Sequence, residues 1–395
     1  MLTICKSLTR VFSVVVALFI SACAHADSWQ ETEKQSAGQT VWFNAWGGDA
    51  SANGYMQWVS EEVKKRYGIT LNIVKVADAA DVVKRIQSEA AAGRTRKGSV
   101  DLMWVNGENF HTLKQGGLLE TQWAETLPNW RYVDTNKPVR EDFAVATEGA
   151  ESPWGSAQLM FIATHSRLPD APGDLASLLA LAKQHPGMLS YPRPPDFIGT
   201  AFLESLLLLL VNDPQVLAKA PDQNFAAVTA PLWDYLDKLH PLLWRKGQDF
   251  PVSAARMDRM LADGELLATL TFNPAHVTHL VKRQQLPADA FAFGFTQGMP
   301  GNVHFVAIPV NSSAKAAAKM VANFLLSPEA QLRKADPAVW GDPTVLDRTK
   351  LTAAQQQQLD AFTTGAPDAI PVLPEPNAAW IPALEAEWTK RYGSR

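Results

Sequence analysis

The chain has 395 residues, 47% of them hydrophobic, and its 36 Lys and Arg are outnumbered by 40 Asp and Glu. This acidic balance argues against nucleic acid and anionic membrane surfaces as partners, because both are bound through clustered positive charge. The length allows a large core and implies two lobes. Both cysteines, Cys5 and Cys23, lie near the start of the chain, which excludes disulfides and cysteine-ligated metals from the rest.

Residues 1–26 have the features of a cleaved secretory leader. Lys6 and Arg10 flank the start of an apolar run at 11–20, and Ala24-His25-Ala26 is typical of a cleavage site. The run is shorter than the ~20 residues that span a bilayer. Removal of the leader leaves 34 Lys and Arg against 40 Asp and Glu, a net charge of −6. A competing hypothesis is a lipoprotein anchored through a lipidated Cys23.

The first part of the mature chain predicts a parallel sheet. Strands are expected at 41–46, 69–76 and 100–105, with amphipathic helices between them, the second one capped by Asp78. Strands that alternate with helices form parallel sheets with right-handed crossovers. Ligands of such sheets bind beyond the carboxyl ends of the strands.

A second unit of helices and strands follows. Helices are expected at 175–182, 198–211, 225–239 and 254–262 and after Asn273-Pro274, and strands at 188–191 and 266–272. The helix at 198–211 is apolar almost all round and is interrupted by Glu204. This pattern predicts a buried core helix and not a membrane span.

Two extended segments are expected to connect the units. A long apolar strand at 154–164 leaves the first unit for the second, and a strand at 291–295 leads back to one at 303–308 and to an Ala-rich helix at 314–326. We therefore predict an α/β, two-lobed architecture in which each lobe is a mainly parallel sheet flanked by helices. The expected limits are 27–156 with 297–345 for lobe 1, 157–296 for lobe 2, and 346–395 for C-terminal helices that pack on lobe 2.

Four segments, in this order, resemble the extracytoplasmic, periplasmic solute-binding proteins of ABC importers. They are VDLMWVNGENFHTLKQGGLLE, SPWGSAQLMFIATHSRL, GELLATLTFNPAHV and FVAIPVNSSAKAAAKMVANFLLSPEAQ. The resemblance is to the type II-like group with two crossings, which includes binders of iron, polyamines and thiamine. It implies capture of a small molecule between the lobes and delivery to permease subunits. We accordingly expect a monomer without enzyme activity, cofactor or metal.

Residues at strand ends and crossings are expected to line the cleft. The candidate ligand-binding residues are Trp46, Gly47, Gly48, Asp49, Asn106, Glu108, Asn109, Trp154, Ser156, Asp196, Phe197, Thr200, Asn273, Trp340 and Asp342. A helix N-terminus after Gly48 favours a negative or carbonyl group, although Asp49 already places a carboxylate there. Several candidates have structural alternatives, since Asp49, Asp196 and Asn273 suit helix caps and Trp154 suits a core.

The chemistry of this set favours a planar or cationic organic solute, thiamine-like or polyamine-like. Tryptophan faces attract cations by ~0.5–2 kcal/mol, and carboxylates accept charge-assisted hydrogen bonds. Sugars, which also stack on tryptophan, stay open. Ferric iron is disfavoured because iron binders of the group usually present adjacent tyrosines. The six tyrosines here are never paired: Tyr55, Tyr67, Tyr132, Tyr191, Tyr235 and Tyr392.

An enzyme is the rival class. The sequence has no His-Glu-x-x-His, Gly-x-Ser-x-Gly or Walker motif. His276 and His279 lie three residues apart on a predicted helix, but no third metal ligand is in view, so we interpret them as surface residues. A periplasmic hydrolase with Glu108 or Asp196 as general base is the alternative function. An adhesion or scaffold protein explains the aromatic strand ends poorly.

Overall fold

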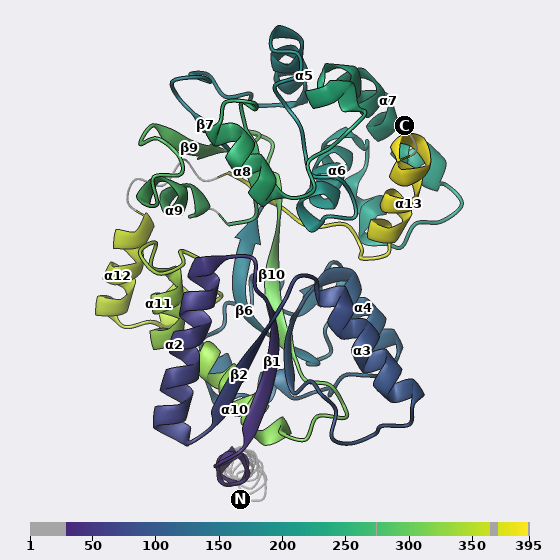
Figure 1. Ribbon diagram of the computed structural model, residues 1–395. Coiled ribbons are helices and arrows are strands. Elements are labelled where there is room, and N and C mark those ends of the chain that lie inside the picture. Colours follow the sequence, from purple (N-terminus) through teal and green to yellow (C-terminus); the bar gives the residue numbers. More distant parts are fainter. Residues whose placement is uncertain (1–28, 274, 364–369, 394–395) are drawn as a thin grey trace, which may run out of the picture.

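The chain folds into two lobes, which lie one above the other in the computed structural model (Figure 1). The structure describes residues 29–273, 275–363 and 370–393, so the predicted leader and Pro274 lie outside it. Each lobe has its own apolar core, with Phe43 buried in the first and Phe161 in the second. The predicted two-lobed α/β architecture is confirmed.

The first lobe is built on a mixed sheet. Its strands are β1 (Thr40–Trp46), β2 (Thr70–Val76), β3 (Leu102–Val105), β6 (Glu151–Gln158), β10 (Met299–Ala307) and β11 (Val372–Leu373). The order is β11-β10-β3-β1-β2, and β6 pairs with β10. β1 is parallel to β2 and β3, as predicted, whereas β10 is antiparallel to β3 and β6. Alternate residues of β1, Val41, Phe43 and Ala45, enter the core.

Helices cover both faces of this sheet. They are α2 (Ala50–Tyr67), α3 (Ala79–Ala91), α4 (Gly107–Gln115), α10 (Lys315–Leu325), α11 (Pro328–Ala335) and α12 (Ala353–Thr363). Met56 of α2 and Val321 of α10 pack with Phe43 on one face. Ile86 of α3 and Phe110 of α4 share a separate cluster on the other face. The apolar stripe of each helix therefore decides which face it covers.

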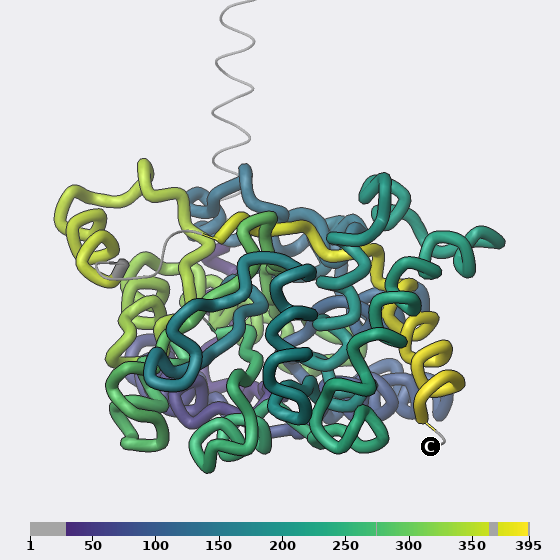
Figure 2. Tube along the Cα trace, turned by 90° about the horizontal axis from the view of Figure 1, so that it is seen from above, coloured from purple at the N-terminus to yellow at the C-terminus, as the bar shows by residue number. Residues whose placement is uncertain are grey.

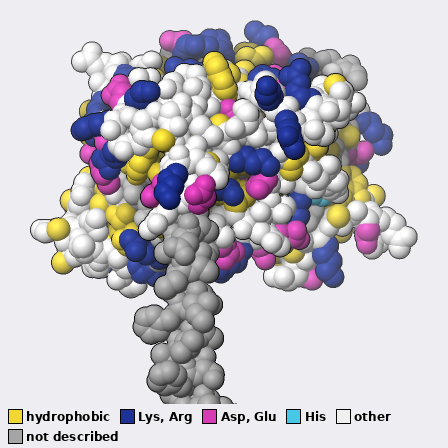
Figure 3. Space-filling view, turned by 90° about the horizontal axis from the view of Figure 1, so that it is seen from below, with side chains coloured by type: hydrophobic (Ala, Val, Ile, Leu, Met, Phe, Trp, Pro, Cys, Tyr) yellow, Lys and Arg dark blue, Asp and Glu magenta, His cyan; other side chains and the backbone are white. Residues whose placement is uncertain are grey.

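Short elements complete the first lobe between α4 and β6 and after α11. They are η1 (Ala124–Thr126), η2 (Pro128–Tyr132), β4 (Glu141–Asp142), β5 (Val145–Ala146) and η6 (Arg348–Lys350). From below, Lys and Arg on this lobe lie among Asp and Glu (Figure 3). No helix in the described part of the chain is both long and apolar enough to cross a membrane.

The second lobe has an antiparallel sheet, which corrects the predicted parallel one. β7 (Met160–Thr164) lies between β8 (Thr269–Thr271) and β9 (Ala290–Phe293) and is antiparallel to both. The predicted strand at 188–191 is irregular chain. Its backbone makes isolated long-range hydrogen bonds and no ladder, since Met188 O accepts from Leu267 N over 2.8 Å and Leu189 O from Trp244 N over 2.8 Å.

Helices form most of the second core. They are α5 (Leu175–Gln184), α6 (Phe197–Leu210), α7 (Phe225–Leu239), α8 (Ala254–Ala262), α9 (His276–Lys282) and α13 (Trp380–Tyr392), with the short turns η3 (Pro214–Ala218), η4 (His240–Leu242) and η5 (Trp244–Gly247). In α6 every residue from 199 to 208 is buried, as its all-round apolar sequence predicts.

Three crossings, not two, connect the lobes. The two predicted ones run from β6 to β7 and from β9 to β10. A third follows residue 370, where β11 pairs with β10 and the Gln158 amide donates to Pro371 O over 3.1 Å. Figure 2 shows this yellow segment crossing from the side of α12 to that of α13.

The two C-terminal helices belong to different lobes. Trp380 and Trp388 of α13 are buried in the second core, whereas Leu359 of α12 packs against the first core. The prediction that 346–395 packs on the second lobe is therefore wrong for α12. The chain ends by returning across the hinge, which local sequence patterns do not reveal.

A buried amide ties α11 to the first crossing and predicts a large loss of stability on substitution. Gln331 is fully buried; its Nε2 donates to Trp154 O (2.6 Å) and Leu325 O (2.8 Å), and its Oε1 accepts from Val345 N (3.1 Å). Gln331→Leu leaves these three backbone groups unmet, at about 1–3 kcal/mol each. We expect urea unfolding to show a loss of at least about 3 kcal/mol.

The control for this substitution is Gln57→Leu, at an exposed glutamine of α2 whose partner is the Glu61 side chain. It removes one surface hydrogen bond and is expected to change stability by less than about 0.5 kcal/mol. Equal effects of the two substitutions would contradict the role given to Gln331.

Candidate functional site

The end of β1 holds the exposed indole of Trp46 at the boundary between the lobes. The side chain is 45% exposed and meets Trp104 edge to face, with ring centroids 6.4 Å apart. Gly48 lies against this ring, since a Cβ at Gly48 would come within 2.3 Å of Trp46 Cζ2. A glycine is needed here because the indole occupies the space of a side chain. The ring's other face stays open to solvent.

Asp49 caps the helix that follows. Its Oδ1 accepts hydrogen bonds from the backbone N–H groups of Ser51 (2.6 Å) and Ala52 (2.9 Å). The backbone N–H groups of Ser51 and Ala52 at the start of α2 thus already donate to a carboxylate. Asp49 is therefore a helix cap in this structure, and its carboxylate occupies the position where an anionic group would bind these two N–H groups.

Gly47 and Ser156 make their contacts with the rest of the protein through backbone atoms. Gly47 N–H donates to Val76 O over 3.0 Å, and Gly47 O accepts from the Asn53 side chain over 2.8 Å. Ser156 lies in β6, half-buried, and its N–H donates to Pro343 O over 3.3 Å. These contacts fix the loop after β1 and the start of the first crossing.

α4 begins directly after β3 and carries three half-buried polar side chains, Asn106, Glu108 and Asn109. Asn106 is the N-cap residue, but its side chain makes no capping hydrogen bond. Burial raises the pKa of Glu108, and the charge of Asp78 raises it further. Because β3 is the parallel neighbour of β1, this loop lies beside the end of β1 that carries Trp46.

The second lobe contributes the N-terminus of α6. Asp196 Oδ1 accepts from the N–H groups of Ile198 (3.0 Å) and Gly199 (3.1 Å), so this residue too is a cap. Burial raises the pKa of Asp196. Phe197 is 46% exposed, and its ring lies 5.1 Å from that of Phe272.

Charged groups of the two lobes lie within electrostatic reach of each other. Besides burial, the charge of Asp78 in the first lobe raises the pKa of Asp196 and Glu385 in the second. Asp78 lies two residues beyond the β2 residue that pairs with Trp46. Phe197 follows Asp196 directly. The exposed rings of Trp46 and Phe197 are thus close in sequence or register to these charged groups, which makes both rings candidates for the walls of the gap.

Two carboxyl groups outside the predicted set, Glu204 and Glu385, lie near the start of α6. Thr200 is buried, and its hydroxyl donates to Glu385 of α13 over 2.7 Å. Glu204, one turn further along α6, is 2% exposed. Burial and the charges of Glu385 and Glu108 raise the pKa of Glu204 to about 8. The signal in the sequence was a single charge inside an otherwise apolar helix.

At another edge of the gap the lobes touch through α9. The ring of His279 lies between the lobes, with Nδ1 3.2 Å from Ser51 Oγ and Nε2 3.1 Å from Pro337 O. Arg283 also donates to Ser51 Oγ, over 3.1 Å. Burial lowers the pKa of His279. The interpretation of this histidine as a surface residue is therefore wrong.

The start of α9 lies at the same edge. His276 Nε2 is 2.8 Å from Asp258 Oδ2, and its Nδ1 is 4.0 Å from Asp49 Oδ2 in the other lobe. Asn273 Oδ1 accepts from Ala275 N over 2.9 Å in the turn before α9, whose N-cap residue is Ala275 and not Asn273 as expected, and the Asn273 side chain is half-buried. No group of three or more metal-ligating side chains occurs among the residues that the structure describes.

Trp154, Trp340 and Asp342 lie inside the first lobe, which corrects their selection as cleft residues. Trp154 is fully buried and Trp340 is 4% exposed, with ring centroids 5.5 Å apart. Asp342 forms a buried ion pair with Lys334 and a 3.1 Å hydrogen bond with His304. Burial alone would raise the pKa of Asp342, but these two partners hold it below its ordinary value.

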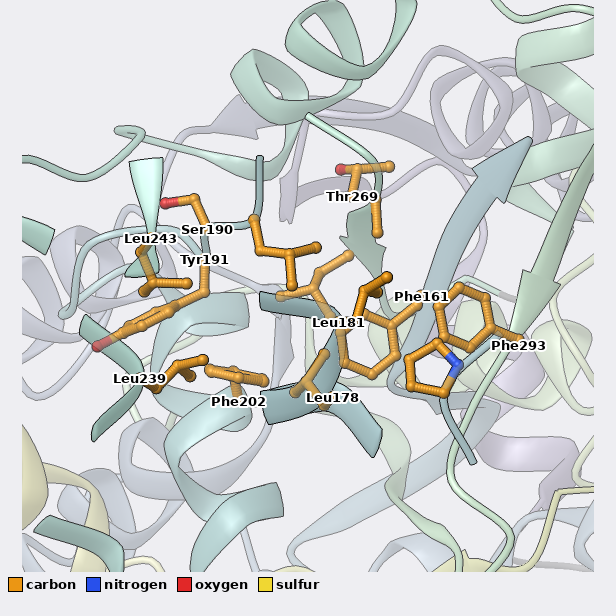
Figure 4. Close-up of a pocket in the computed structure, with 14 residues that line it drawn as sticks. Phe161, Leu178, Leu181, Ser190, Tyr191, Phe202, Leu239, Leu243, Thr269 and Phe293 are labelled. Carbon is orange, nitrogen blue, oxygen red and sulfur yellow. The ribbon is translucent and has the colours of Figure 1, made fainter. Parts of the chain in front are cut away.

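A cavity in the second lobe is too small for a solute. Figure 4 shows Phe161, Leu178, Tyr191 and Phe202 around it, and its volume is about 20 Å³. Such a volume holds about one water molecule. These residues are part of the second core, so the cavity is a packing defect and the gap between the lobes remains the candidate site.

Comparison with known proteins agrees with this arrangement. Residues 58–363 match the family model described as bacterial extracellular solute-binding protein. The chain is 61% identical over 381 residues to Protein YnjB of Escherichia coli (strain K12), a match that covers 96% of this chain and 97% of that protein.

Solved structures share the fold at low sequence identity. The periplasmic binding protein AfuA from Actinobacillus pleuropneumoniae, with fructose-6-phosphate bound, has a TM-score of 0.62 at 14% identity, covering 90% of this chain and 99% of that one. A putative spermidine/putrescine ABC transporter protein from Listeria monocytogenes has a TM-score of 0.61 at 15% identity, with coverage of 90% and 99%. The apo ferric ion-binding protein A of Pasteurella haemolytica has a TM-score of 0.63 at 13% identity, with coverage of 90% and 98%.

The lobes approach each other closely at Gly341, and this contact predicts a substitution that blocks closure. A Cβ added at Gly341 in the first lobe would come within 2.1 Å of Ala275 Cβ in the second. Gly341→Ala should therefore push the lobes apart, because overpacking typically costs 1–3 kcal/mol. We expect at least about fivefold fewer closed molecules, measured as a larger radius of gyration by small-angle X-ray scattering.

Gly117→Ala is the matched control for Gly341→Ala. Both glycines have a positive φ, +62° and +77°, but an added Cβ at Gly117 meets no atom within 4 Å. Backbone strain is thus similar in the two variants, and only Gly341→Ala adds a contact between lobes. The same scattering profile for both variants would refute the proposed contact.

Proposed function

Because the chain belongs to the family of bacterial extracellular solute-binding proteins, we propose that it serves an ABC importer. In this role it captures a small planar or cationic organic solute between its lobes and delivers it to the membrane permease. The observation that carries the choice of solute is the pairing of exposed rings, Trp46 and Phe197, with carboxyl groups of both lobes. Thiamine-like and polyamine-like molecules have the matching chemistry.

The electrostatics of the gap support a positively charged solute. The pKa values of Glu108, Asp196, Glu204 and Glu385 are all raised, first by burial and then by neighbouring carboxylates. No lysine or arginine of the described chain offsets these shifts. A cation entering the gap would supply the missing charge through charge-assisted hydrogen bonds and through attraction to the aromatic faces.

The proposed mechanism is closure about the three crossings. Free protein samples open states, and a solute that touches both lobes favours the closed one by its differential affinity. A micromolar dissociation constant corresponds to about −8 kcal/mol. Ring stacking and a few charged hydrogen bonds supply this after the costs of ordering.

The proposed location is the periplasm. It rests on the family description and on the leader at 1–26, which lies outside the described residues. We propose cleavage after Ala26 and a mature monomer that reaches the membrane through the permease. Lipidation of Cys23 is the alternative mode of attachment, and intact-mass measurement of the protein purified from membranes distinguishes the two.

Removal of the Trp46 indole should weaken binding. Trp46→Ala deletes one wall of the gap, and we expect at least a tenfold loss of affinity for thiamine or spermidine in titration calorimetry. Trp42→Ala is the control, because Trp42 lies on the same strand, is 47% exposed and is four residues farther from the strand end. Unchanged binding in Trp46→Ala would remove this residue from the site.

A further inference from the structure

A buried carboxyl group on α6 lacks a hydrogen-bond donor for one of its oxygens. Glu204 is 2% exposed, and its Oε1 has no partner among the described residues. Leaving such an acceptor unmet costs about 1–3 kcal/mol, and more when it is charged. This oxygen therefore needs either a proton of its own or a hydrogen-bond donor that the described chain does not supply.

Glu204 lies on the face of α6 that meets α13. Thr200 lies one turn earlier on the same face of α6, and its hydroxyl donates to Glu385 over 2.7 Å. Glu385 is half-buried, so this carboxyl group is still reached by solvent. Glu108 of the first lobe acts electrostatically on both Glu204 and Glu385. The pair is thus within electrostatic reach of a carboxyl group of the first lobe.

The ionisable groups around the pair are acidic on every side. They are Glu108 at the start of α4, Asp78 between β2 and α3, Asp196 at the start of α6, and Glu375 on the third crossing, which is itself close to Asp142. Asn302 of β10 donates to Glu375 Oε1 over 3.0 Å. No basic residue of the described chain neutralises Glu204 or Glu385.

Building on the proposed function, we propose that Glu204 and Glu385 bind a primary or secondary ammonium group of the solute in exchange for a proton. In this step a neutral carboxyl group ionises and its proton passes to the solvent. The N–H groups of the ammonium then donate to the carboxylate, with no covalent bond formed or broken in the solute. Each ammonium bound displaces about one proton.

The titration of the pair sets the pH range of the exchange. Burial and neighbouring charges raise the pKa of Glu204 to about 8 and that of Glu385 to about 7. Both groups therefore hold protons at pH 6, and these protons compete with the solute. Affinity should rise with pH from 6 to 8, by about tenfold per pH unit for each proton exchanged. The rise ends well below the pKa of an alkylamine, near 10.

Spermidine, which carries primary and secondary amines, is the probe for a calorimetric test. Titrations at pH 7 in phosphate and in Tris, whose ionisation enthalpies differ, count the protons released on binding. We expect about one proton per spermidine in the wild type. Glu204→Gln should release markedly fewer protons and bind at least tenfold more weakly at pH 8. Glu385→Gln should change both quantities in the same direction.

Glu387→Gln is the matched control on α13. Its carboxylate pairs with Lys390 and Arg391 on the same helix, two residues from Glu385 in sequence. We expect wild-type affinity and proton release. Spermidine binding without proton release would overturn the exchange and leave the proposed cationic solute standing. No spermidine binding would exclude the ammonium class, whereas thiamine binding that depends on Trp46 would still support the proposed function.

A second measurement on the ligand-free protein keeps folding effects apart from binding. A carboxyl group whose pKa is raised by folding binds its proton more tightly in the native state, so it contributes stability at low pH. That contribution is lost as the pH rises from about 4.5 to about 8. The thermal midpoint of the wild type should fall over this range and that of Glu204→Gln should fall less. Parallel curves would contradict a proton on Glu204.

Discussion

The hinge of this protein depends on one strand pair, the antiparallel ladder between β6 and β10. Its register runs from Gln158 opposite Gly301 to Glu151 opposite Ala307, with an irregularity after His304. Both strands belong to the first lobe, yet β6 leads directly into β7 of the second, and β9 of the second leads into β10 through residues 294–298. The ladder therefore fixes where the second lobe begins, and β11 adds a third connection to β10. The proposed closure would therefore turn on the few residues beyond its ends.

The elements with local signals were predictable from the sequence. The parallel unit of β1, β2 and β3, the buried helix α6 and the cap at Asp196 follow from periodicity and capping residues, which act over a few positions. The antiparallel sheet of the second lobe was not predictable in this way. Its pairing depends on which strands return across the hinge, and that is decided by contacts far apart in the chain.

The prediction of candidate site residues was limited for the same reason, because burial depends on contacts far apart in the chain. Trp46, Trp154 and Trp340 look alike in sequence, since each lies near a glycine and a polar residue. Only Trp46 ends a strand with its ring in solvent, while the other two pack around Trp104 in the first core. Glu385 could not be found locally, because α13 reaches the gap only after the chain has crossed the hinge a third time. Burial in a two-lobed protein is a non-local property.

The helix termini at the gap decide the sign of charge that it accepts. The N-termini of α2 and α6 would attract an anion, but Asp49 and Asp196 already occupy their N–H groups. α4 lacks a side-chain cap and instead carries Glu108 in its first turn. With these positive ends satisfied from within the chain, Glu204 and Glu385 have no counter-charge. In the proposed function, a phosphate or carboxylate would meet repulsion from both lobes, whereas an ammonium group would neutralise these carboxylates together.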